Sequence, residues 1–218
     1  MKNLNLLAVL CLSLVAASSQ AIIVSVGGTA SLIAAPADAR LDALTGSDIV
    51  PVWDETQGFT LTSNLKVDAV SSGTYTVASD LPVVQPEISA GSVVNSHYIH
   101  FDSPASNAAA AVGSVTFGED ILGVIVMGDS NGTPKTLDLS DYLASGTLHD
   151  DNLNHRGLEL DSSDWFGISA DRRTLNYGFA ITQPGDRIRV VTAPEPVSIL
   201  GMVAGIGMLV NSRRRKSA

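Results

Sequence analysis

Hydrophobic and polar residues alternate with a period of two in several parts of the chain. The clearest case is the stretch 175–181, where Leu, Tyr, Phe and Ile alternate with Asn, Gly and Ala. This period puts the large apolar side chains on one face, as in a half-buried β-strand. The stretch 121–127 is instead apolar at nearly every position, which predicts a central strand covered on both faces.

Turn residues separate these stretches from further short apolar segments. We predict additional strands at 22–26, 74–77, 93–101, 113–117 and 188–191. Only 106–111 and 140–144 favour short helices, from an alanine-rich run and from a serine followed by a closing glycine. Strands at intervals of about ten residues are typical of antiparallel sandwiches. The pattern therefore predicts an all-β fold, with one β-sandwich or jelly-roll-like domain over residues 22–192.

The residues before this domain have the three parts of a secretory signal peptide. Lys2 is followed by an apolar stretch over residues 6–17 and then by Ser19-Gln20-Ala21. This order predicts that signal peptidase cleaves after Ala21, with a cut after Ser19 as the alternative. The only cysteine, Cys11, lies within residues 1–21, so the exported body has no disulfide and no cysteine-based metal site.

The residues after the domain form another three-part segment. Pro194-Glu195-Pro196 is followed by an apolar run at 197–210 and by a basic tail of Arg213, Arg214, Arg215 and Lys216. A helix over the run would span only about 21 Å of a hydrocarbon core about 30 Å thick. The prolines keep the backbone extended for a processing enzyme, and the basic tail favours the cytoplasmic side. We predict a short transmembrane helix that stops export.

This segment, residues 193–218, resembles the PEP-CTERM sorting signal of Gram-negative bacteria. It departs from that family at Val197 and Ser198, where Ser-Thr is frequent. The resemblance implies transient residence in the inner membrane and processing by an exosortase. The protein would then pass to the cell surface or extracellular matrix, often together with exopolysaccharide. A plain short membrane tail is the alternative.

The body also resembles a recurring domain found ahead of PEP-CTERM tails. The matching segments are 52–55, 97–102, 113–117, 121–124 and 185–190. This resemblance supports the domain boundaries and implies no catalytic residue.

Without its two end segments the chain keeps 8 basic and 21 acidic residues, a formal charge of −13. Such an excess of negative charge disfavours nucleic acid as a partner and is compatible with cation binding. Two acidic loops carry hard oxygen ligands of the kind that calcium prefers. They supply Asp129, Asn131, Asp150, Asp151 and Asn152. Neither loop matches an EF-hand, and ordinary tight turns are the alternative interpretation. Calcium is the only cofactor that the sequence suggests.

The remaining candidates for ligand binding are aromatic residues and histidines. On a strand His97 and His100 face opposite sides, so they cannot readily share an ion, whereas His100 and Asp102 share a face. Trp53 and Trp165 could stack on sugar rings, and core packing is the alternative. The candidate ligand-binding residues are therefore Trp53, Trp165, His100 and Asp102.

The sequence singles out no catalytic residue. A Gly-x-Ser-x-Gly sequence occurs once, at residues 128–132 within one of the acidic loops, and no phosphate-binding glycine loop is present. Glycan hydrolysis needs two facing carboxyl groups, and the sequence selects no pair among Glu55, Glu87, Glu119 and Glu159. We expect no enzyme. The leading hypothesis is an exported structural or adhesive protein of the cell surface or biofilm matrix. A calcium-assisted carbohydrate-binding module is the alternative, and a glycan hydrolase is a third, weaker one.

Overall fold

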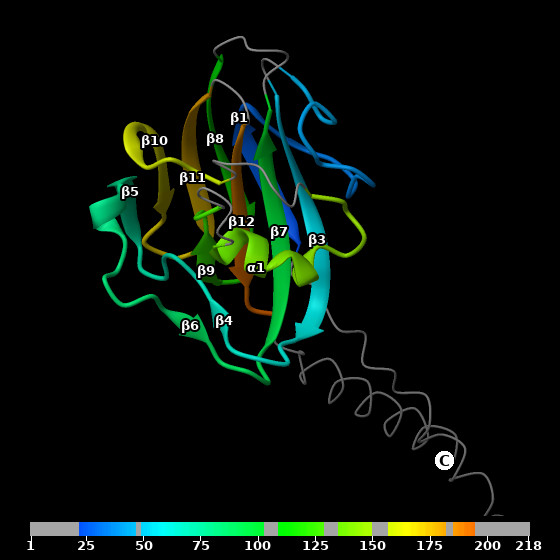
Figure 1. The fold of residues 1–218 in the computed structure, drawn as a ribbon, viewed down its shortest axis with the longest axis vertical. Coiled ribbons are helices and arrows are strands. Elements are labelled where there is room, and N and C mark those ends of the chain that lie inside the picture. Colours follow the sequence, from blue (N-terminus) through cyan, green and yellow to red (C-terminus); the bar gives the residue numbers. More distant parts are fainter. Residues whose placement is uncertain are drawn as a thin grey trace, which may run out of the picture. The chain divides into compact units, whose positions relative to one another are not determined.

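The described part of the chain is built almost entirely from β-strands, as the alternation of its residues predicts. The structure is a computed structural model, and it describes residues 22–46, 49–102, 109–128, 135–149, 157–181 and 185–194. The all-β class is confirmed (Figure 1). No helix in these ranges is long and apolar enough to cross a membrane. The predicted signal peptide, the apolar run 197–210 and the basic tail lie outside them.

Ten of the strands form two five-stranded sheets. The first sheet has the order β1 (Ile23–Gly28), β8 (Ala109–Phe117), β11 (Thr174–Ile181), β10 (Asp161–Ile168) and β5 (Gly73–Val77). The second has the order β2 (Ala30–Leu32), β3 (Val50–Thr60), β7 (Val93–Phe101), β12 (Asp186–Thr192) and β9 (Ile121–Ile125). All neighbours in these sheets are antiparallel except β2 and β3.

The remaining elements are short. β4 (Leu65–Lys66) and β6 (Glu87–Ile88) pair with each other in a small third sheet. The helical elements are η1 (Ala78–Asp80), α1 (Thr136–Leu139) and η2 (Asp141–Leu143). Because α1 and η2 follow one another, the helix predicted at 140–144 is confirmed in part. Ser140 does not cap it, since its hydroxyl donates to the carbonyl of Leu137.

The main hydrophobic core contains residues from both large sheets. The first sheet contributes Val115, Phe166 and Tyr177, and the second contributes Ile99, Phe101 and Ile188. Each large apolar side chain that is fully buried stabilises the fold by about 1.5–3 kcal/mol. The two sheets therefore pack against each other through the faces that the alternation makes apolar.

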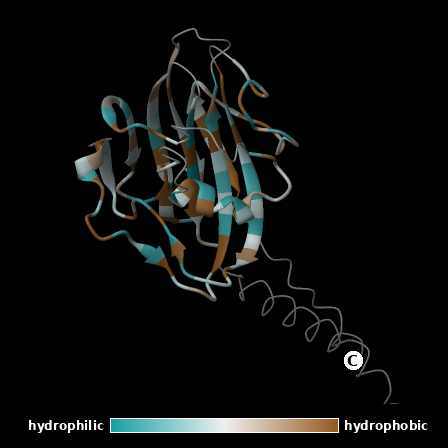
Figure 2. Cartoon of the chain, viewed as in Figure 1, coloured by the Kyte–Doolittle hydropathy of each residue, from teal (hydrophilic) through white to brown (hydrophobic). Residues whose placement is uncertain are grey.

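The other face of the second sheet is covered as well. A second apolar cluster joins residues of this sheet to α1 and η2, and it includes Trp53, Tyr98, Val191, Leu137 and Leu143. All seven residues of β12 are consequently buried. Figure 2 shows that hydrophilic residues also occur within the strands of this sheet. Where such residues are buried, their polar groups need hydrogen-bond or ionic partners inside the protein.

The stretch 121–127 is covered on both faces, but the predicted central position is wrong. β9 lies at the edge of the second sheet, beyond β12. Its outer edge is closed by Asp68 and Ala69, whose backbone amides donate to the carbonyl of Val124 at 2.8 and 3.2 Å. The side chain of Val67 lies against Gly123, where a Cβ would come within 2.7 Å of it. An irregular segment thus replaces the neighbouring strand.

A second correction concerns the predicted helix at 106–111. Residues 109–111 of that stretch belong to β8, which pairs with β11 through Ala109, Ala110 and Ala111. Alanine has no strong preference against a strand once its neighbours supply the pairing. Here tertiary pairing overrides the helix propensity of an alanine-rich run.

Candidate functional site

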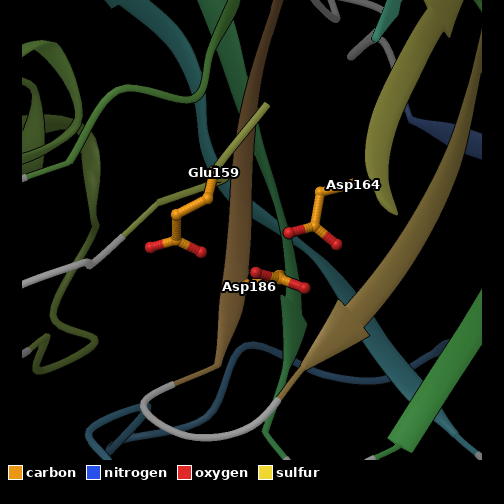
Figure 3. Close-up of side chains that lie close together, drawn as sticks. All are labelled: Glu159, Asp164 and Asp186. Carbon is orange, nitrogen blue, oxygen red and sulfur yellow. The ribbon is translucent and has the colours of Figure 1, made fainter. Parts of the chain in front are cut away.

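Three carboxylates come together at one end of the space between the two sheets. Asp164 lies in β10 of the first sheet, Asp186 begins β12 of the second sheet, and Glu159 lies just before β10. One carboxylate oxygen of each lies within 4.8 Å of the others. Figure 3 shows the three side chains converging on the same small space. This cluster is the candidate functional site.

The local sequence explains why the two aspartates point inward. Phe166 and Ile168 of β10 lie in the main core, so alternation directs Asp164 to that same face. Ile188 of β12 lies in the core as well, and alternation again turns Asp186 inward. Leu158 and Leu160 are buried in the core on either side of Glu159, which leaves Glu159 exposed. The site is therefore closed on the protein side and open at Glu159.

Burial and mutual repulsion set the electrostatics of the cluster. Asp186 is 1% exposed and Asp164 is 4% exposed. Burial raises the pKa of Asp186 well above its ordinary value, and the charges of Asp164, Glu159 and Asp161 raise it further. Burial also raises the pKa of Asp164 to about 6, against the hydrogen bond that it accepts from the amide of Ala180 at 2.7 Å. The cluster thus favours neutralisation, by protons or by a cation.

A separate ion network is buried on the opposite face of the second sheet. Arg189 of β12 binds Glu55 of β3 through two parallel hydrogen bonds of 2.7 and 3.0 Å. Its other donors reach the carbonyl of Leu137, the hydroxyl of Ser140 and the carboxylate of Asp141. All five N–H groups of the guanidinium are therefore used. The network joins the sheet to α1 and η2 and has the geometry of a structural clamp.

Glu55 stays ionised in this network despite its burial. Burial alone would raise the pKa of Glu55, but the charge of Arg189 outweighs it, together with hydrogen bonds from His149, Arg189 and Ser96. These partners hold the pKa of Glu55 well below its ordinary value of 4.5. The carboxylate is thus fully engaged, which excludes it from general acid catalysis at neutral pH.

A surface hollow lies over the outer face of the first sheet. It has a volume of about 510 Å³ and is lined by Ser72, Gly73, Thr74, Trp165, Gly167, Ile168, Ser169, Ala170 and Asn176. Trp165 is half-buried there, opposite Gly178 of β11. A Cβ at Gly178 would lie 2.1 Å from the indole nitrogen, so the glycine makes room for the ring. The hollow thus combines one aromatic ring with hydroxyl and amide groups.

The candidate ligand residues do not gather in one place. Trp53 is fully buried, with its ring centroid 5.1 Å from that of Tyr98. His100 and Asp102 are buried too, and Asp102 accepts a hydrogen bond from the amide of Asp42 at 2.6 Å. Trp53 therefore does not reach the surface, which corrects its assignment to a sugar-binding groove, whereas the pairing of His100 with Asp102 stays a prediction. Of the four candidates, Trp165 alone lies at a surface hollow among the described residues.

The two strand histidines lie on opposite faces, as predicted. The ring of His97 packs on Phe117 of the main core, and His100 lies near Trp53 on the other face. His97 contacts Asp54 at 2.6 Å and Thr192 at 3.0 Å through its two ring nitrogens. It therefore links β3 to β12 and has a structural role. The proposed calcium ligands Asp129, Asn131, Asp150, Asp151 and Asn152 lie outside the described residues.

The carboxylate cluster and the buried arginine were not predicted from the sequence. The available signal was the run Asp186-Arg187-Ile188-Arg189, which places three charged residues inside an otherwise apolar strand. Charged residues are almost never fully buried unless they are paired or bind a metal. That rule would have selected β12, although it could not have named the partners Glu55 and Asp164. Comparisons with family models, curated proteins and solved structures find no match to this chain.

Proposed function

We propose that the protein is an exported β-domain of sandwich type with a structural or adhesive role at the cell surface or in the extracellular matrix. In this proposal signal peptidase removes residues 1–21. An exosortase then processes the chain at Pro194-Glu195-Pro196, after the apolar run 197–210 has held it in the inner membrane. In this role the domain acts through binding and packing. Its buried charged groups hold the fold together as structural clamps.

One observation supports the proposal most directly. The first strand begins at Ile23, two residues after the predicted signal cleavage site, and the last strand ends at Thr192, two residues before Pro194. Just beyond β12, the amide of Ala193 donates to the carbonyl of Asp120 at 3.0 Å. Every strand that the structure describes therefore lies between the two processing sites, and both cuts would leave these sheets whole.

The mass and location of the mature protein test this proposal. In the native host we expect a protein without residues 1–21 and without the segment after the Pro194 motif, found outside the cell. In a strain without exosortase the basic tail should remain attached and the protein should stay in the inner membrane. An intact tail at the inner membrane in both strains would show a plain membrane anchor. The matrix role would then lose its main support.

The hollow beside Trp165 favours carbohydrate binding as a second candidate function. A half-exposed indole flanked by hydroxyl and amide groups offers a stacking surface and hydrogen-bond partners for a sugar. The hollow is open to solvent, as suits the side of a polysaccharide chain more than an enclosed monosaccharide. In this form the module uses Trp165 and Asn176, and not Trp53 or His100.

A glycan array with the full-length chain tests this second function, in calcium and in chelator. The variant Trp165→Ala is expected to weaken binding by about tenfold, which is the loss of one aromatic stacking contact. Tyr142→Ala is the matched control, because Tyr142 is an aromatic residue, 48% exposed, on η2. Absence of binding under both conditions, or equal weakening by both variants, would refute a sugar site at Trp165.

A further inference from the structure

We propose that Glu159, Asp164 and Asp186 bind a calcium ion that links the two sheets. Asp164 comes from the first sheet and Asp186 from the second, while Glu159 precedes β10. Their ligand oxygens lie within 4.8 Å of one another. A single ion between them would hold the two sheets together where the core ends (Figure 3).

A second observation points to a ligand at this place. The Oδ2 atom of Asp186 is buried, and no hydrogen-bond donor among the described residues reaches it. Its side chain is directed toward Asp164 and Glu159 (Figure 3). A buried carboxylate oxygen without a donor costs free energy, and native proteins leave few of them. An ion in the cluster supplies the missing partner.

The neighbouring arginines do not fill this place. Arg187 follows Asp186 in β12, so alternation directs its side chain to the opposite face of the strand, with Arg189. Arg189 is bound to Glu55 on that face at 2.7 Å. Among the groups that act on the pKa of Asp186, Arg187 has the smallest effect. Among the described residues the cluster therefore contains three carboxylates and no arginine side chain from β12.

The third ligand is positioned by the backbone around it. The amide of Arg187 donates to the carbonyl of Gly157 at 2.9 Å, and the amide of Leu158 donates to Val126 at 2.9 Å. Gly157 has a φ of 129°, and a Cβ there would lie 2.2 Å from the carbonyl oxygen of Val126. The segment before β10 is thus fixed against β12. Glu159 is held near the two aspartates before any ion arrives.

The ligand chemistry selects calcium among common cations. Zinc prefers nitrogen and sulfur ligands, and the cluster contains only carboxylates. Magnesium demands near-ideal octahedral geometry and keeps several waters, which a site between two buried aspartates does not accommodate well. Calcium accepts about six to eight oxygens in flexible geometry, and three carboxylates supply up to about six of them. Water can complete the shell on the exposed side of Glu159.

Thermal unfolding of the full-length chain in detergent tests the proposal, with circular dichroism as the signal. Calcium at about 100 times its dissociation constant is expected to raise the Tm by about 5–10 °C over the chelated protein, and magnesium by much less. Asp186→Asn should abolish this rise. In chelator the same variant should be at least as stable as the parent, because it removes a buried charge.

Two further variants keep the test decisive. Glu159→Gln changes an exposed ligand, so it should fold even where Asp186→Asn does not, and it should weaken calcium binding at least tenfold by titration calorimetry. Glu119→Gln is the matched control, because it removes one charge in the turn between β8 and β9 near the far end of β12. Calcium affinity should not change in this control.

Other results would overturn the proposal. A calcium-dependent rise in Tm that survives both Asp186→Asn and Glu159→Gln would mean that the ion binds elsewhere, for instance in the loops at 129–132 and 150–154. No rise in the parent protein would mean that protons alone neutralise the cluster.

Discussion

Replacing Arg189 by methionine should lower the free energy of unfolding by about 3–5 kcal/mol, because the change leaves Glu55 as an unpaired charge in the interior. Arg189 and Glu55 are both fully buried, and they share two hydrogen bonds. The same substitution removes the hydrogen bonds from Arg189 to Ser140 and Asp141, which loosens α1 and η2. Urea denaturation of the full-length chain measures the loss, with the fluorescence of buried Trp53 as the signal.

A double variant separates charge from packing. When Glu55→Leu accompanies Arg189→Met, no buried charge remains in the pair, and most of the lost stability should return. Arg173→Met is the matched surface control. Arg173 pairs with Asp120 at 3.3 Å with both side chains about half exposed, so this change should cost no more than about 1 kcal/mol. A loss as small as this in Arg189→Met would contradict the role of the network.

Acid should destabilise the parent protein more steeply than the double variant Glu55→Leu/Arg189→Met. The folded pKa of Glu55 lies below its ordinary value of 4.5, so the folded state binds this proton less readily than the unfolded state. Stability from Glu55 is therefore fully present above about pH 4.5 and is lost as the pH falls. The loss from this one group reaches at most about 1.4 kcal/mol per pH unit.

Denaturation curves from pH 6 down to pH 2 test this difference between the two proteins. The groups that face Glu55 are Arg189, His149 and Ser96, and Asp141 acts through Arg189. Other titrating residues, including Asp164 and Asp186, are common to both proteins and cancel in the comparison. Equal slopes for the two proteins would show that Glu55 titrates normally, contrary to its buried pairing with Arg189.

The strands that could be predicted are those whose two faces differ. In β11, Leu175, Tyr177 and Phe179 are buried, as their alternation with smaller or polar residues predicts. β7 has the predicted bounds, Val93–Phe101. The eleven-residue strand β3 was not predicted, because Pro51, Asp54 and Gly58 interrupt its apolar pattern. Its polar residues are tolerated because the interior supplies partners, among them His97 for Asp54.

The candidate site could not be predicted, because its residues come together through contacts between distant parts of the sequence. Asp164 and Asp186 belong to different sheets and meet only because both strands face the same core. Neither residue differs from an ordinary turn aspartate when it is considered alone. Glu55 and Arg189 lie 134 positions apart, and nothing near Glu55 in the sequence marks its partner. One-dimensional patterns identify a buried face, whereas pairing across it is decided by the fold.

The interior position of β12 in the second sheet has a consequence for the order of folding. This strand joins β7 to β9, and it is the last strand among the residues that the structure describes. A chain that leaves a ribosome or a translocation channel with its N-terminus first cannot complete the second sheet until residue 192 is free. Until then β9 has no neighbouring strand in that sheet, and Glu55 lacks its ion-pair partner Arg189. Such long-range closure is slow, so the domain matures only when the residues next to Pro194 have emerged.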